Sequence, residues 1–264
     1  MENIETTDSK MNDMLEMQKD YFIKNGPPSL ELRIDRLNRL KNLILNNKTE
    51  IIKSINDDFG NRSDNASLLS DIYMIIQSIS YASKNLNHWT KSEKRSSNFP
   101  FNLFGAKSYV QYEPLGTVGM ISPWNFPIAI PAWKAAPALM CGNAVILKPA
   151  SLTPASAIAL TEIIDKQDLP AGLFNLVIGS GSGIGNQIAT NPDIPAITFT
   201  GSVEVGKSLY ADASPLLKKM QMEMGSKNPL VVLDDADLST AISCAANGAY
   251  GGTGQKCTAS SRII

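Results

Sequence analysis

The chain has 264 residues, of which 43% are hydrophobic and 19% charged, and its formal net charge is −1. This composition is typical of a soluble globular protein with one large α/β domain or two smaller ones. The balanced charge gives no basic field for nucleic acid, and no apolar run reaches the roughly 18 residues of a membrane span. Residues 1–5 are acidic and lack the apolar core of a secretory signal, so we expect a cytoplasmic protein.

Cysteine and histidine usage excludes further kinds of site. The cysteines, Cys141, Cys244 and Cys257, have no regular spacing, which argues against a disulfide framework. The only histidine is His88, and without a Cys/His cluster no metal site is expected. We interpret Cys141 and Cys244 as packing residues in apolar helical surroundings, and His88 as a surface or packing residue.

The first ninety or so residues show helical periodicity. Apolar residues recur at helical spacing over 8–24, and Gly26-Pro27-Pro28 ends that helix. Ser29 has the character of an N-cap for a second helix, and further helices are predicted over 48–59 and 66–91. The last of these is expected to bury a stripe made of Leu69, Ile72, Ile76, Ile79, Leu86 and Trp89.

A less regular stretch separates these helices from the rest of the chain. The basic run 91–95 is interpreted as a solvated linker. The alternation of residue types in 107–113 predicts a two-faced strand, which we interpret as part of an arm that reaches out of the domain.

From Gly116 onward, short apolar runs alternate with helical segments. The runs, each expected to be a strand, are 117–121, 144–147, 174–178, 196–199 and 219–222. The helices expected between them are 130–140, 153–166, 183–190 and 203–213. The fold class is therefore α/β, a doubly wound, Rossmann-like parallel sheet preceded by a helical N-terminal segment. In such sheets ligands bind beyond the carboxyl ends of the strands.

Several residues that follow these strands have the character of ligand contacts. Thr200-Gly201-Ser202 opens a helix whose free N–H groups suit a phosphate, although the same residues make a good turn and N-cap. The turn 179–183 is not Gly-x-Gly-x-x-Gly, because Ile184 replaces the third glycine, and we interpret it as a turn close to a ligand. Lys148 either binds a ribose or phosphate or is solvated. Asn125, between two prolines, either stabilises an oxyanion or serves a turn.

The last quarter of the chain carries a carboxylate and a thiol in glycine-rich surroundings. Glu223 precedes Gly225, and Cys257 follows the glycine-rich stretch 251–254. A thiol nucleophile needs open space and a base for a later water, and glycines supply the space. The residues alone favour a surface carboxylate for Glu223 and a buried small residue for Cys257.

Taken together, these pieces resemble the aldehyde dehydrogenase superfamily, from about residue 112 to 262 and more weakly through the N-terminal helices. The matching motifs are 114–119, Pro123-Trp124-Asn125-Phe126-Pro127, 138–143, Lys148-Pro149-Ala150, Phe199-Thr200-Gly201-Ser202, Glu223-Met224-Gly225 and Gly254-Gln255-Lys256-Cys257. The N-terminal part and 113–127 resemble coniferyl-aldehyde and class 3-like members, whereas 148–161 and 228–261 resemble semialdehyde dehydrogenases.

This resemblance implies the oxidation of an aldehyde to a carboxylic acid with NAD or NADP. Cys257 would attack the aldehyde to form a thiohemiacetal, which hydride transfer converts to a thioester. The Asn125 amide and the Cys257 backbone N–H would hold the oxyanion, and Glu223 would activate the hydrolytic water.

The resemblance also implies the residues that hold the cofactor. They are Ile121, Pro123, Trp124, Lys148, Ser151, Gly181, Gly201, Ser202 and Gly225. Many NAD-preferring members carry a glutamate where this chain has Ser151, so here no carboxylate would repel a 2′-phosphate and Lys148 would attract one. We therefore predict that NADP is tolerated or preferred.

Members of this family are nearly twice as long, which shapes the expected organisation. Residues 1–93 and 113–225 are expected to form the cofactor-binding domain, 94–112 an oligomerisation arm, and 226–264 the incomplete start of a catalytic domain. The full-length form is expected to be a homodimer or homotetramer that acts on a small-molecule aldehyde, first a semialdehyde such as succinate semialdehyde and next an aromatic or aliphatic aldehyde.

Two interpretations of this chain then follow. In the first, it is an N-terminal portion that is inactive alone. In the alternative, it is a complete but vestigial nucleotide-binding protein without turnover.

Overall fold

A parallel sheet forms the centre of the computed structural model, which describes residues 5–166, 170 and 172–264. The sheet has five strands in the order β5-β4-β3-β6-β7. They are β3 (Thr117–Ile121), β4 (Ala144–Lys148), β5 (Phe174–Leu176), β6 (Ala196–Gly201) and β7 (Lys219–Met224). The chain builds outward from β3 to β5, then crosses back to place β6 on the other side of β3. The predicted doubly wound α/β fold is therefore confirmed.

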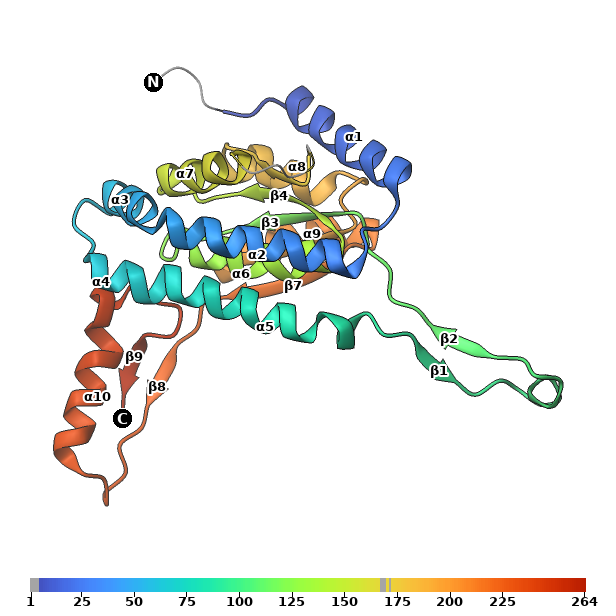
Figure 1. Cartoon of the computed structure of the whole chain (residues 1–264). Helices are drawn as coiled ribbons and strands as arrows, with labels where there is room; N and C mark the ends of the chain where they lie inside the picture. Colours follow the sequence, from blue (N-terminus) through green and yellow to red (C-terminus); the bar gives the residue numbers. More distant parts are fainter. Residues whose placement is uncertain (1–4, 167–169, 171) are drawn as a thin grey trace.

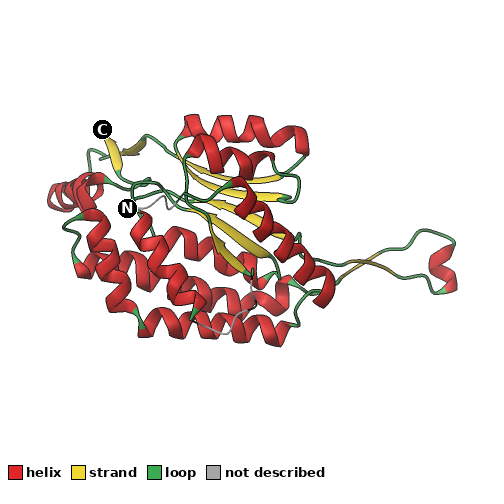
Figure 2. Cartoon of the chain, turned by 90° about the horizontal axis from the view of Figure 1, so that it is seen from above, coloured by secondary structure: helices red, strands yellow, loops and turns green. Residues whose placement is uncertain are grey.

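Helices cover both faces of this sheet (Figure 2). Successive side chains of a strand point to opposite faces, so Val145 and Leu147 of β4 join one hydrophobic cluster and Ile146 the other. The first cluster is completed by α2 (Leu30–Asn46), α3 (Lys48–Phe59), α5 (Met74–Trp89), α6 (Ala129–Met140) and α7 (Pro154–Asp165). The second is completed by α1 (Asp8–Asn25), α8 (Asn186–Thr190) and α9 (Val203–Ala213). Because both faces are covered, a ligand reaches the sheet only where its strands end.

The helix predicted over 66–91 runs as consecutive segments of different pitch. These are α4 (Asp64–Ser67), the π-helical η1 (Leu68–Tyr73) and α5. Ile72, Ile79 and Leu86 are buried as expected, but the prediction for Leu69 is wrong, since its side chain is 66% exposed. A π-helical turn carries more residues than an α-helical turn, so the buried stripe does not keep a single register along the whole segment.

A two-stranded arm extends away from the body of the molecule (Figure 1). In it β1 (Glu93–Arg95) pairs antiparallel with β2 (Ser108–Val110), and the 3₁₀ turn η2 (Phe101–Phe104) lies between them. The interpretation of 91–95 as a plain linker is wrong, because Lys94 pairs in register with Tyr109. The strand predicted over 107–113 is correspondingly shorter. The use of this arm in oligomerisation stays a prediction.

Residues 226–264 form a small second unit below the main sheet (Figure 1). Here β8 (Asn228–Leu230) pairs in parallel with β9 (Ser260–Ile263), and α10 (Leu238–Tyr250) connects them. No side chain of α10 is buried, and Leu238, Ile242 and Tyr250 are exposed. An apolar face of this size is unusual on the surface of a monomeric soluble protein.

Among the described residues, none of the helices combines the length and the apolar character that a membrane span requires. Residues 1–4, which belong to the acidic start that argued against a secretory signal, lie outside the described residues.

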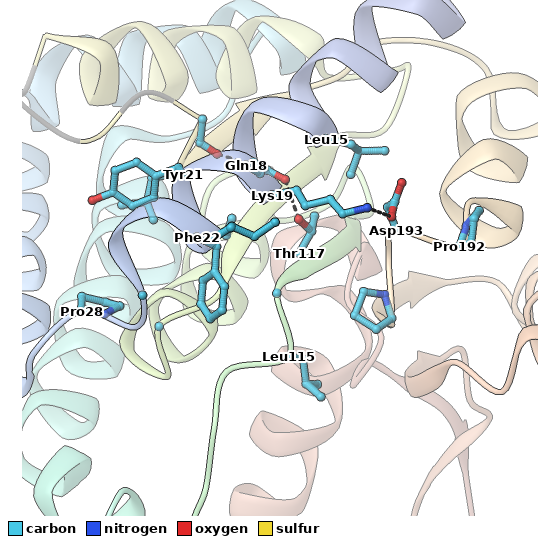
Figure 3. Close-up of a pocket in the computed structure, with 18 of the residues that line it drawn as sticks. Leu15, Gln18, Lys19, Tyr21, Phe22, Pro28, Leu115, Thr117, Pro192 and Asp193 are labelled. Carbon is cyan, nitrogen blue, oxygen red and sulfur yellow. Dashed lines mark hydrogen bonds and ion pairs between the residues drawn. The ribbon is translucent and has the colours of Figure 1, made fainter.

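Helix α1 crosses the amino ends of the strands and lines a cavity of about 280 Å³ there (Figure 3). Gln18 of α1 is only 4% exposed. Its Nε2 donates to the carbonyl oxygens of Val145 (3.2 Å) and Gly172 (2.7 Å). Its Oε1 accepts from the hydroxyl of Thr117 at 2.7 Å. One buried amide thus bonds α1 to β3, to β4 and to the residues just before β5.

Replacing Gln18 by alanine is expected to lower the free energy of unfolding by about 2–4 kcal/mol, because buried partners lose their hydrogen bonds. The matched control is Lys19→Ala, which removes an ion pair with Asp193 whose side chains are 59% and 50% exposed. Such a pair contributes about 0–1 kcal/mol. Urea denaturation measures both losses, and equal losses in the two variants would contradict the role assigned to Gln18.

Candidate active site

A cleft of about 1140 Å³ opens at the carboxyl ends of the strands. From β3 the chain continues to β4 on one side and from β6 to β7 on the other, which is the switch point where doubly wound sheets bind ligands. The predicted site residues that line this cleft are Ile121, Pro123, Trp124, Asn125, Lys148, Gly181, Gly201, Ser202, Glu223, Gly225 and Cys257. The predicted thiol, carboxylate and amide thus converge on one hollow, although their roles remain predictions.

Ser151 is the one predicted site residue outside this lining. It is exposed, and its hydroxyl donates to the carbonyl oxygen of Gly179 at 3.4 Å. The residue therefore lies on the loop after β4, beside the glycine turn that follows β5.

Asn125 sits in the loop between β3 and α6. Its side-chain Nδ2 donates to the backbone carbonyl oxygen of Gln255 at 2.9 Å, and the backbone carbonyl oxygen of Asn125 accepts from Arg62 Nη1 at 2.9 Å. The amide therefore points toward the segment immediately before Cys257. An amide nitrogen carries two hydrogens, so one remains for a ligand in the cleft.

Cys257 reaches the cleft through a left-handed turn. Gly252, Thr253 and Gly254 all have positive φ, at 63°, 57° and 69°. A positive φ is costly for a residue with a side chain, so Thr253 marks local strain at this turn. The carbonyl oxygen of Cys257 accepts from Asn228 Nδ2 at 2.7 Å, and the thiol is free and exposed. The backbone is thereby held while the sulfur stays accessible.

Glu223 stands near the end of β7, where Thr200 of β6 is its partner in register. Its Oε1 accepts from Gln221 Nε2 at 3.2 Å, and the side chain is exposed. A Cβ placed on Gly225 would meet no atom within 4 Å, so the chain leaves open space next to this carboxylate. Space beside a carboxylate is what the activation of a water molecule requires.

Lys134 of α6 is a residue of the cleft that the sequence analysis missed. Its Nζ donates to Thr198 Oγ1 at 2.8 Å and to Gln221 Oε1 at 3.2 Å. Burial lowers the pKa of Lys134 to about 8, although the Glu223 carboxylate opposes this shift. A lone lysine within the apolar helical stretch 129–140 was the signal available in the sequence. A group with such a pKa can exchange protons near neutral pH.

The other end of the cleft has features that suit a phosphate. The hydroxyl of Ser202 accepts from the Val205 N–H at 3.2 Å and so caps the N-terminus of α9. A Cβ on Gly201 would lie 2.5 Å from Phe199 Cζ, so the packed ring leaves no room for a side chain there. Lys148 is buried, its Nζ donates to the Pro149 carbonyl oxygen at 3.0 Å, and burial lowers its pKa.

Two hydroxyl groups in the cleft test whether it fits a polar cofactor. The Oγ of Ser122 and the Oγ1 of Thr200 are buried without a hydrogen-bond partner among the described residues. Both residues lie at or beside the carboxyl ends of β3 and β6, and both line the cleft. Buried polar atoms are nearly always partnered in native proteins. The orphaned hydroxyls, the capped helix and the glycines therefore fit a nucleotide with sugar and phosphate groups.

Comparison with known proteins gives the family. The protein-family model described as "Aldehyde dehydrogenase family" matches residues 6–264, so the chain belongs to this family. The alpha-ketoglutaric semialdehyde dehydrogenase of Bacillus subtilis (strain 168) is 51% identical over 151 residues, which are 57% of this chain and 31% of that protein. A probable coniferyl aldehyde dehydrogenase of Caulobacter vibrioides is 35% identical over 259 residues, covering 96% of this chain and 52% of that protein.

Solved structures agree with this assignment. An aldehyde dehydrogenase from Bacillus cereus, solved as an NAD+ complex, is 28% identical with a TM-score of 0.89, over 98% of this chain and 52% of that one. A betaine aldehyde dehydrogenase from Staphylococcus aureus, solved with NAD+ and a BME-modified cysteine, has a TM-score of 0.91 over 98% of this chain and 51% of that one. The chain thus spans about half the length of these proteins, and the resemblance inferred from the motifs is confirmed at the level of the family.

The lowered pKa of Lys134 predicts an unusual reactivity. Acetylation of Lys134 by acetic anhydride, which transfers an acetyl group to the amine and releases acetate, is expected to reach half its maximal rate near pH 8, because the neutral amine reacts and its fraction rises through the pKa. An unperturbed lysine does so at about 10.4. Peptide mass spectrometry across a pH series measures the midpoint. Glu223→Gln, the control, removes a charge that raises this pKa, so the midpoint should fall further, and a midpoint near 10.4 would contradict the interpretation.

Proposed function

We propose that this chain supplies the nucleotide-binding surface and the nucleophilic thiol of an aldehyde dehydrogenase that uses NAD or NADP. The observation that supports this most is the shared cleft of Cys257, Glu223 and Asn125 at the carboxyl edge of the sheet. Membership of the family supplies the reaction, and the geometry supplies the residues for each step. When bound, the cofactor accepts a hydride.

The thiol chemistry follows from the contacts in the cleft. Cys257 attacks the aldehyde carbon as its thiolate, and the carbonyl electron pair moves onto oxygen to give a thiohemiacetal anion. The free N–H of Asn125 and the backbone N–H of Cys257 hold this oxyanion. Loss of hydride from the same carbon restores the C=O bond as a thioester. Water, deprotonated by Glu223, then displaces the thiolate and releases the acid.

Lys134 serves the last step in this proposal. Its ammonium lies close enough to Glu223 for the carboxylate to influence its pKa, and Gln221 bonds to both residues. The proton that Glu223 takes from water therefore has a nearby group that titrates at about pH 8. The pair provides a route by which the base is reset between turnovers.

The nucleotide is assigned to the rest of the cleft. Ser202 and the N-terminus of α9 face the pyrophosphate, and Lys148 the adenosine ribose. The remaining predicted cofactor residues of the lining would contact the nucleotide along its length: Ile121, Pro123, Trp124, Gly181, Gly201 and Gly225. In this assignment residues 1–93 and 113–225 form the cofactor-binding domain, 94–112 an arm for a homodimer or homotetramer, and 226–264 the start of the catalytic domain.

A semialdehyde is the proposed substrate. The support is the 51% identity to an alpha-ketoglutaric semialdehyde dehydrogenase, which exceeds the 35% identity to the coniferyl aldehyde relative. The coniferyl aldehyde relative matches nearly the whole chain and makes an aromatic aldehyde the second candidate. A panel of aldehydes assayed with an active form of the protein distinguishes them.

We expect the purified 264-residue chain to bind nucleotide without sustained turnover. Binding is expected because eleven of the predicted site residues line one cleft, and the lack of turnover is expected from the exposed side chains of α10. Tryptophan fluorescence during an NADH titration measures binding, and NADH absorbance with NAD+ and succinate semialdehyde measures turnover. Sustained NADH production would overturn the expected inactivity, whereas no nucleotide binding by the folded chain would overturn the proposed function.

The absence of a carboxylate at position 151 predicts that NADPH binding is tolerated or preferred. Ser151→Glu is expected to weaken NADPH binding by about tenfold, since a carboxylate repels the 2′-phosphate. Lys148→Met should weaken NADPH more than NADH, whereas Ser151→Ala is the matched control and should change neither. Fluorescence titrations of the wild type and the three variants measure the affinity of each for NADH and for NADPH. Tight NADH binding with no measurable NADPH binding would refute this prediction.

A further inference from the structure

A buried ion pair joins the N-terminal helices to the cleft. Arg62 Nη2 lies 2.8 Å from Asp71 Oδ2, with the two side chains 14% and 0% exposed. Burial raises the pKa of the Asp71 carboxyl, while Arg62, the Ala129 amide and the Ser70 hydroxyl act in the opposite direction. A carboxylate so deep in the protein is costly unless every oxygen has a partner. Here both oxygens are bonded, so the pair is a defined structural element.

The guanidinium of Arg62 is held on all sides. Besides the ion pair, its Nη1 donates to the carbonyl oxygen of Asn125 at 2.9 Å. Its Cζ lies 4.9 Å from the ring centroid of Phe59 and 5.6 Å from that of Phe126. A planar fork that is stacked and doubly hydrogen-bonded has one position, and lysine cannot reproduce it.

The same ion pair fixes the other end of the Asn125 loop. Asp71 Oδ1 accepts from the N–H of Ala129, the first residue of α6, at 3.0 Å. The start of the loop is held where the Ser122 N–H donates to the Lys148 carbonyl oxygen at 3.0 Å. The peptide carbonyl of Asn125 and the start of α6 are therefore both bonded to one rigid pair from outside the sheet.

We propose that Arg62, locked in place by Asp71, is a positioning residue that sets the location of the Asn125 amide. This inference rests on the proposed function, in which Asn125 holds the oxyanion. Because hydrogen-bond stabilisation of an oxyanion depends on donors preset within tenths of an ångström, loss of the Arg62 contact releases the donor without removing it. Arg62 touches neither the thiol nor the reacting carbon, and it acts through the backbone of the loop.

Hydrogen–deuterium exchange on the 264-residue chain tests this inference without cofactor or aldehyde. Arg62→Met is expected to speed exchange of a peptide covering 122–130 by about tenfold, since exchange of a protected amide follows the free energy of local opening. The peptide that covers 144–148 in β4 should keep its rate. Arg62→Lys retains a cation for Asp71 but loses the fork, so it should speed the same loop with little loss of global stability.

The matched control is Arg39→Met, which removes an exposed ion pair with Asp35 on α2. It should leave the 122–130 peptide unchanged. If Arg62→Met does not fold, Arg62→Lys carries the comparison. The positioning role would be overturned if the folded Arg62 variants exchange the 122–130 peptide at the wild-type rate. It would also be overturned if the exchange rates of all peptides rise by the same factor. Since no turnover is measured, failure of the dehydrogenase proposal, shown by absent nucleotide binding, is a separate result.

Discussion

The pairing of β3 with β4 on one side and β6 on the other is the constraint on which the rest of the structure depends. The helices on the two faces then bury this central strand, so its residues need apolar partners above and below. Gly119 illustrates how tight this is, because a Cβ there would lie 2.6 Å from a methyl of Ile188. With both faces closed, polar chemistry is confined to the strand ends. The loops after β3 and β6 meet the end of β7 there, and the Asn125 amide, the Gly201-Ser202 turn and the Glu223 carboxylate come together.

The electrostatics of the cleft follow from the same burial. Lys134 and Lys148 project from elements of the sheet and its covering helix into a partly dry space, where desolvation lowers both pKa values. Neither lysine has a bonded carboxylate, because Lys134 bonds to Thr198 and Gln221 and Lys148 to a carbonyl oxygen. Burial without a bonded carboxylate disfavours the charged form, so both lysines give up a proton more readily than an exposed lysine does.

The sequence was sufficient for the parts of this structure that repeat locally. The short runs located all of β3 to β7, and in β3, β4 and β6 they are continuous because a strand buried on both faces needs hydrophobic residues throughout. Motif resemblance located most of the cleft, since strand ends in a doubly wound sheet converge whatever their sequence separation. Leu69 was predicted wrongly because the π-helical turn of η1 leaves no sign in the residue pattern. Arg62 and Asp71 were not predicted as a pair, since nothing in their spacing shows that the segment after α3 contacts η1 beside the Asn125 loop.

The position of the thiol depends on two amides that approach it from different parts of the chain. Asn125, from the main sheet, donates to the carbonyl oxygen of Gln255, and Asn228, at the start of β8, donates to that of Cys257. The strained turn at Thr253 lies just before these two anchors. The backbone at Cys257 is thus held by hydrogen bonds from two side-chain amides rather than by packing, and the thiol lines the cleft although α10 beside it buries no side chain. Apolar cover for α10 would add stability to this unit, but the backbone that carries the thiol is already held by the two amides.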